Sequence, residues 1–181
     1  MSDEVPQNPF EDYDRENAAL NAQLQAFLAE HGALAMYHLG SFLNWDTCEP
    51  TLLWMVQHPD CPKAVASRLF WLSGVEYVVA EAGSDYQPDT QIMEAILKRW
   101  KAGDYRAHGW GDPEPEATLY EIDYYRNSAG VKAAGNPLGI PDNLFELVQG
   151  PIPDCPPHLK PPQNPALNEL LLDLGMFFGE D

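Results

Sequence analysis

Basic residues are scarce in this sequence. Its 181 residues include 10 Lys and Arg against 28 Asp and Glu, which gives a formal net charge of −18 and a pI near 4.3. Nucleic-acid phosphates and anionic lipid headgroups are bound by positive charge on a protein, so both are unfavourable partners for this chain. The excess of carboxylates either serves solubility alone or attracts a basic protein partner by electrostatic steering.

Cysteine is scarce as well, and neither a long apolar run nor a signal sequence is present. The three cysteines, Cys48, Cys61 and Cys155, contain no C-x-x-C pair and leave an odd count, which favours a reducing compartment. No apolar run approaches the roughly 18 to 20 residues of a membrane span. The first ten residues also lack the basic and apolar regions of a signal peptide. The sequence therefore predicts a cytoplasmic protein.

The motifs of common enzyme classes are missing. We find no G-x-S-x-G, H-E-x-x-H, P-loop or G-x-G-x-x-G pattern. Asp104 and His108 are close in sequence and could form an acid–base pair, but such a pair serves equally as a loop hydrogen bond. We therefore predict no catalytic residue and no cofactor.

A zinc site also finds little support in the sequence. Structural zinc is held by four ligands, usually in two closely spaced pairs. Only His58 and Cys61 are closely spaced, whereas Cys48 and Cys155 lie further away along the chain. These residues are better explained as small or half-buried side chains at helix ends, and we predict no metal ligand.

Apolar residues recur at helical spacing along most of the chain, which predicts a mainly α fold. We expect a compact bundle of short antiparallel helices, onto which a C-terminal helix docks. Residues 75–82 fit a strand or a helix, and we favour a helix. The expected helices cover residues 14–31, 33–43, 46–58, 61–73, 89–102 and 164–178, with Asn44, Asp46 and Asn164 as capping residues.

Prolines and glycines are concentrated in residues 103–163, which hold ten of the seventeen prolines and seven of the thirteen glycines. Proline interrupts regular elements, so this segment is expected to be irregular and to wrap around the helical core. Within it, residues 118–126 fit a short strand, a turn or a helix, and residues 143–148 a short helix. Residues 1–13 are expected to form a flexible acidic arm that precedes a single domain, residues 14–181.

Three short clusters of residues resemble a bacterial family of unknown function. The clusters are N-W-D at residues 44–46, H-P-D-C at residues 58–61 and L-F-W at residues 69–71. In this order they resemble the domain-of-unknown-function family DUF4274, and the resemblance covers about residues 38–82. Thr47 and Cys48 replace the D-G expected after N-W-D. The resemblance implies a small helical fold in a bacterium and no specific activity, although small acidic proteins of this kind often accompany toxins as immunity proteins.

One segment combines tyrosines with carboxylates and is the best candidate for a partner-binding surface. Tyrosine offers a rigid contact area with a hydrogen-bonding group, and nearby carboxylates suit a basic partner. The alternative is a solvated loop whose tyrosines cover the edge of the core. The candidate residues are Glu114, Glu116, Tyr120, Glu121, Asp123, Tyr124 and Tyr125.

The leading functional hypothesis is an acidic bacterial protein-binding module. Its most concrete form is an immunity protein that neutralises a cognate, basic toxin by occlusion, without any chemistry of its own. Two alternatives stay open. One is an enzyme that uses carboxylates, with or without a divalent metal. The other is a structural adaptor that assembles subunits through the exposed side of the C-terminal helix.

Overall fold

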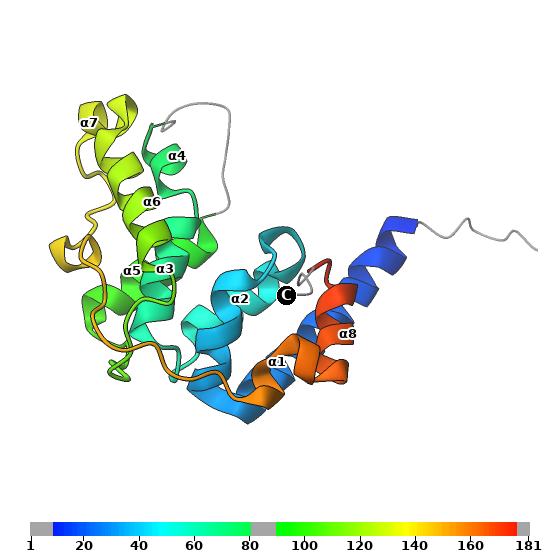
Figure 1. Cartoon of the computed structure of the whole chain (residues 1–181). Helices are drawn as coiled ribbons and strands as arrows, with labels where there is room; N and C mark the ends of the chain where they lie inside the picture. Colours follow the sequence, from blue (N-terminus) through cyan, green and yellow to red (C-terminus); the bar gives the residue numbers. More distant parts are fainter. Residues whose placement is uncertain (1–8, 81–89, 177–181) are drawn as a thin grey trace, which may run out of the picture.

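Helices account for most of the structure, a computed structural model that describes residues 9–80 and 90–176 (Figure 1). No β-strand occurs in these residues, which confirms the predicted mainly α fold. Within the same ranges, no helix combines the length and the apolar character of a membrane span. The α-helices are α1 (Pro9–Leu39), α2 (Trp45–Gln57), α3 (Lys63–Leu72), α4 (Val75–Ala80), α5 (Gln91–Ala102), α6 (Pro115–Asn127), α7 (Ala129–Ala134) and α8 (Pro165–Asp173), and the 3-10 helices are η1 (Gly40–Phe42), η2 (Asp142–Leu144), η3 (Pro157–Leu159) and η4 (Pro161–Gln163).

The first two predicted helices are joined into one bent helix, α1. The bend lies at Gly32, whose φ of 66° and ψ of −153° are not helical, so the predicted end of the first helix is a kink. The start of α1 at Pro9 corrects the predicted arm, because residues 9–13 are helical. Proline is favourable in the first turn of a helix, and acidic residues there complement the helix dipole. The rest of the predicted arm, residues 1–8, lies outside the described part of the chain.

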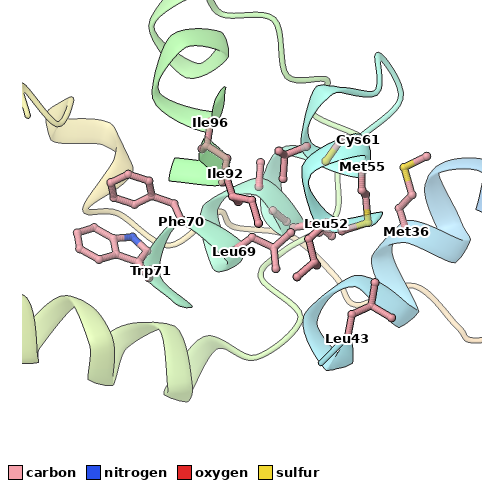
Figure 2. Packing of buried hydrophobic residues seen from close by; sticks show 14 of the residues in the cluster. Met36, Leu43, Leu52, Met55, Cys61, Leu69, Phe70, Trp71, Ile92 and Ile96 are labelled. Carbon is pink, nitrogen blue, oxygen red and sulfur yellow. The ribbon is translucent and has the colours of Figure 1, made fainter. Parts of the chain in front are cut away.

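The hydrophobic core lies where α1, α2, α3 and α5 meet (Figure 2). Leu52 of α2, Leu69 of α3 and Ile96 of α5 are completely buried there. These side chains belong to the apolar positions that predicted the helices, so the helical periodicity identified the inner faces of all three elements.

Two asparagines cap helices as the sequence predicts. The Asn44 side chain accepts a hydrogen bond of 3.0 Å from the Asp46 backbone N–H at the start of α2, and Asn164 accepts one of 3.2 Å from Leu167 at the start of α8. Asp46, expected to be a cap as well, lies inside the first turn of α2 and is not the capping residue. Each such cap satisfies a backbone donor that has no partner within the helix.

The prediction that residues 103–163 are irregular is wrong for residues 115–134, which form α6 and α7. Pro115 occupies the first turn of α6, where the missing N–H costs nothing, and no further proline follows until residue 137. Thr118 and Ile122, four residues apart, are fully buried on one face of α6. Residues 118–126 are therefore helical. Residues 75–80 are also helical, as favoured, whereas residues 81–82 lie outside the described ranges.

Residues 135–164 do wrap around the helices, as predicted (Figure 1). Backbone hydrogen bonds hold this segment: Gly111 N–H donates to the Pro151 carbonyl (3.1 Å) and Asp112 N–H to that of Val148 (2.8 Å). The helix expected at residues 143–148 is reduced to the single 3-10 turn η2. Backbone groups of a proline-rich chain find few partners within the chain segment itself, so they pair with neighbouring loops.

The C-terminal helix α8 docks on α1. Its Leu167 and Leu171 are buried, and the Thr47 hydroxyl donates a hydrogen bond of 2.6 Å to the Leu174 carbonyl just beyond the helix. The helix ends at Asp173 instead of residue 178, and Phe177, expected on its apolar face, lies outside the described residues.

Candidate partner-binding site

The seven predicted partner-binding residues lie on α6 or directly before it, but they do not form one surface. Because successive residues of a helix point about 100° apart, α6 distributes them over different faces. Glu114 precedes the helix and forms an ion pair, and Tyr125 is buried. The other five, Glu116, Tyr120, Glu121, Asp123 and Tyr124, are exposed or half-buried.

Glu114 connects α6 to α3. Its carboxylate oxygen lies 2.8 Å from the guanidinium of Arg68, whose side chain is only 7% exposed. The Asp112 carboxylate accepts a hydrogen bond of 2.8 Å from the Glu114 backbone N–H, and burial raises the pKa of Asp112. Removal of one partner of a buried ion pair leaves an uncompensated charge, so Glu114 has a structural role.

Tyr125 belongs to the core. Only 4% of it is exposed, and its ring lies 5.5 Å from that of Trp71 and 5.8 Å from that of Phe145, between ring centroids. For this residue the alternative interpretation, a tyrosine that covers the edge of the core, is correct.

Tyr120 and Tyr124 are the exposed tyrosines of α6. They are 66% and 46% exposed, and their rings stack with centroids 6.3 Å apart and an angle of 15° between the planes. Their spacing of four residues places them on the same face of the helix. Glu116 and Asp123 are exposed beside them. The helix thus presents two rigid aromatic rings among carboxylates.

A hollow of about 380 Å³ lies between α4 and α6, and we call it the tyrosine–acid hollow. Four aromatic side chains and two carboxylates dominate its lining, and the two helices contact each other directly (Figure 1). The lining residues are Trp71, Leu72, Gly74, Glu76, Tyr77, Tyr120, Glu121 and Tyr124.

The hollow carries negative charge without a compensating cation. Glu76 is only 6% exposed, and its burial raises its pKa, to which the nearby Glu121 adds. The pKa of Tyr77 is raised too, chiefly because a tyrosinate there would be repelled by a second tyrosinate at Tyr124, and then by the Glu76 carboxylate. Among the residues that the structure describes, neither Glu76 nor Glu121 forms an ion pair. A cation that entered the hollow would meet both carboxylates.

Two glycines set the position of α4 and therefore the shape of the hollow. Gly74 has a φ of 70°, a conformation that side-chain-bearing residues adopt reluctantly, and it turns the chain from α3 into α4. A Cβ on Gly130 of α7 would lie 2.6 Å from the Cβ of Ala80, so α7 packs tightly against the end of α4. The glycines thus hold α4 beside α6.

The sequence interpretation missed Trp71, Glu76 and Tyr77 as parts of the site. Residues 75–82 were considered only for their secondary structure. A usable signal existed, because Glu76-Tyr77 repeats the acid–aromatic neighbours of Tyr120-Glu121 in reverse order. The distance of more than forty residues along the chain concealed that the two pairs line one hollow.

A second hollow of about 370 Å³ lies between the end of α1 and the proline-rich segment, and we call it the apolar groove. Phe42, 54% exposed, lies at this groove, and Cys155 is half-buried in its lining. The groove is lined by His38, Leu39, Phe42, Cys155, Leu159, Lys160, Pro161, Pro162 and Gln163.

The candidate catalytic and zinc residues are dispersed. Cys61 is buried, and burial raises the pKa of its thiol to about 12, which disfavours the thiolate that binds zinc. His108 stacks on Trp110 with ring centroids 4.9 Å apart, and Asp104 is exposed. In the described ranges, no three His, Cys, Asp or Glu side chains are grouped closely enough to hold a metal ion.

No protein-family model, curated protein or solved structure matches this chain. Its function therefore has to be inferred from its own geometry and charge. The most distinctive feature is the surface formed by the tyrosine–acid hollow and the adjoining exposed side of α6, to which Glu116 and Asp123 belong. We call it the tyrosine–acid face. Its chemistry suits the binding of a cationic partner.

Proposed function

We propose that this chain is a bacterial, cytoplasmic immunity protein that binds a basic toxin and occludes it with the tyrosine–acid face. One observation carries the proposal: exposed, stacked tyrosines lie among carboxylates that have no cationic partner within residues 9–80 and 90–176. Interfaces are enriched in tyrosine, because it contributes a large contact area at a small cost in conformational entropy.

The use of basic residues inside the molecule supports this proposal. Arg68 pairs with Glu114 and Arg106 with Asp60, while Arg99 donates to the carbonyls of Val56 and His58, at 2.6 and 2.8 Å. Arg68 and Arg99 are thus occupied by internal contacts, whereas Arg106 neutralises one exposed carboxylate. A net charge of −18 then remains to accelerate association with a positively charged partner.

Co-expression with the product of the neighbouring open reading frame tests the proposal. If that product is a toxin, we expect this chain to rescue growth and to form a complex with it. Exposed charges around the interface steer association and are screened by salt. The affinity of the complex should therefore fall as the salt concentration rises from about 50 to 300 mM. The paired variant Glu116→Gln/Asp123→Asn should weaken the complex.

The matched control is Asp142→Asn/Glu169→Gln, which removes the same number of charges from exposed positions outside the tyrosine–acid face. Equal weakening by both pairs would contradict this location for the interface. A failure to rescue growth, together with a stable homo-oligomer in size-exclusion chromatography, would favour the adaptor hypothesis instead.

A further inference from the structure

We propose that the tyrosine–acid hollow binds a single arginine side chain of the partner. The inference rests on the proposed function, since it names the residue with which the basic partner would engage. It also makes a claim of its own, because the hollow should recognise an isolated guanidinium group.

The walls of the hollow provide aromatic faces for a cation. Tyr77, Tyr120 and Tyr124 come from α4 and α6 and line the same space. A cation within about 6 Å of such a ring is attracted by its π-electrons, more strongly when water is excluded. Tyr120 and Tyr124 already stack on each other, so both rings lie on the same side of α6 before any partner binds.

The carboxylates of the hollow also require a cation. A buried carboxylate is unfavourable unless it is paired, and Glu76 is almost completely buried beside Glu121. The Glu76 carboxylate accepts a hydrogen bond from its own backbone N–H, but the chain provides no cation: all ten of its Lys and Arg residues lie in the described ranges, and none forms an ion pair with either glutamate. An external cation would relieve this unfavourable charge.

Arginine fits this hollow better than lysine. Its planar guanidinium can stack on a tyrosine ring and still donate two parallel hydrogen bonds to one carboxylate, whereas an ammonium acts as a point charge. Both kinds of cation lie over rings elsewhere in this protein, Arg99 at 4.3 Å from the Tyr105 centroid and Lys63 at 4.7 Å from that of Trp100, so the paired hydrogen bonds to a carboxylate are what favour arginine. A volume of about 380 Å³ is near the lower limit for ligand pockets, which suits one side chain and not a large cofactor.

The test uses the full chain and three small probes: the N-acetyl, N′-methylamide derivatives of arginine, lysine and citrulline. Citrulline has nearly the shape of arginine but no charge. In NMR titrations, we expect the arginine probe to shift the ring resonances of Tyr77, Tyr120 and Tyr124 in a saturable way. It should bind about tenfold tighter than citrulline and about threefold tighter than lysine.

Three variants distinguish specific binding in the hollow from attraction of the probe by the overall negative charge of the protein. Glu121→Gln should weaken binding of the arginine probe about fivefold or more. Glu116→Gln removes the same charge from the same helix but not from the lining, and should change the affinity less than about twofold. Tyr120→Leu, at a position that is 66% exposed and tolerant of substitution, should weaken binding about threefold. Circular dichroism melts check that all three variants fold.

The outcomes are decisive for both proposals. Equal binding of arginine and citrulline, equal weakening by Glu116→Gln and Glu121→Gln, or no saturable shift at tens of millimolar probe overturns the arginine site. A toxin complex that withstands Glu121→Gln but is weakened by Tyr120→Leu and by Glu116→Gln/Asp123→Asn supports the proposed function and overturns the arginine site. Specific arginine binding without any toxin complex supports the site and contradicts the proposed function.

Discussion

The tyrosine–acid hollow and the apolar groove have nearly the same volume, about 380 and 370 Å³, but opposite chemistry. Glutamate and tyrosine side chains line the first, whereas proline, leucine and phenylalanine dominate the second. They also differ in construction. Packed helices form the walls of the hollow, and a segment of short 3-10 turns forms one wall of the groove (Figure 1).

This difference shows that cavity size alone does not indicate which surface binds a partner. The hollow has carboxylates without a described cationic partner and stacked tyrosine rings, and both point to one class of ligand. It is also tied to the core, because the Trp71 indole N–H donates a hydrogen bond of 3.0 Å to the Leu144 carbonyl. Rigid support of this kind favours specific recognition, since little order has to be gained on binding.

The largest expected effect concerns the support of the hollow. Trp71 is 1% exposed, so Trp71→Ala should lower the free energy of unfolding by about 3–5 kcal/mol, measured by urea denaturation. Phe42→Ala at the apolar groove removes a side chain that is 54% exposed and should change it by no more than about 0.5 kcal/mol. If both substitutions lowered the free energy of unfolding equally, the core would not support the hollow more firmly than the groove.

The next effect concerns the spacing of the helices that form the hollow. Gly130→Ala places a Cβ 2.6 Å from that of Ala80 and should lower the free energy of unfolding by about 1–3 kcal/mol. Displacement of α4 should also weaken the binding of the arginine probe to the hollow. Ala133→Ser, an exposed position on the same helix, is the control and should be neutral within about 0.5 kcal/mol. Unchanged stability of the Gly130 variant would mean that α7 does not position α4.

Substitution of the buried Glu76 in the hollow should have a smaller effect, and it should stabilise the protein. The folded protein raises the pKa of Glu76, so the ionised carboxylate destabilises the fold above that pKa. Glu76→Gln should therefore raise the free energy of unfolding at pH 7 by up to about 1 kcal/mol. The gain should disappear as the pH falls through the raised pKa, because a protonated glutamate and a glutamine are then nearly equivalent. Melts at pH 7 and pH 4 measure the difference, and a gain that persists at pH 4 would exclude this origin.

The smallest effect is expected from occupying the apolar groove. Cys155 is half-buried there, whereas Cys48 and Cys61 are buried, so a maleimide should label the native protein first at Cys155. The modified protein should bind the arginine probe within about twofold of the unmodified chain, because neutral groups far from the hollow leave its charges unchanged. Mass spectrometry confirms the site of labelling. A large loss of probe affinity would show that the two cavities are coupled.

The sequence predicted those elements whose signals are local. Helix α5 was predicted close to its observed bounds, and the start of α8 was predicted from its Asn164 cap, although α8 ends at Asp173 instead of residue 178. For α6 the sequence left strand, turn and helix open at residues 118–126, because the prolines at residue 113 and at its first position, 115, indicated an irregular segment. Proline interrupts a helix in its interior but not at its start, so the position of each proline matters more than the number.

By itself the sequence determined the acidic charge, the mainly helical fold and the segment in which the exposed tyrosines occur. Only the tertiary structure decided that Tyr125 is buried while its neighbour Tyr124 faces solvent, and that Glu114 pairs with Arg68. Adjacent residues on a helix point about 100° apart, so their fates depend on which face meets the core. That face is fixed by contacts between α3, α4 and α6, which are distant in sequence and leave no local signal. The same contacts create the tyrosine–acid hollow.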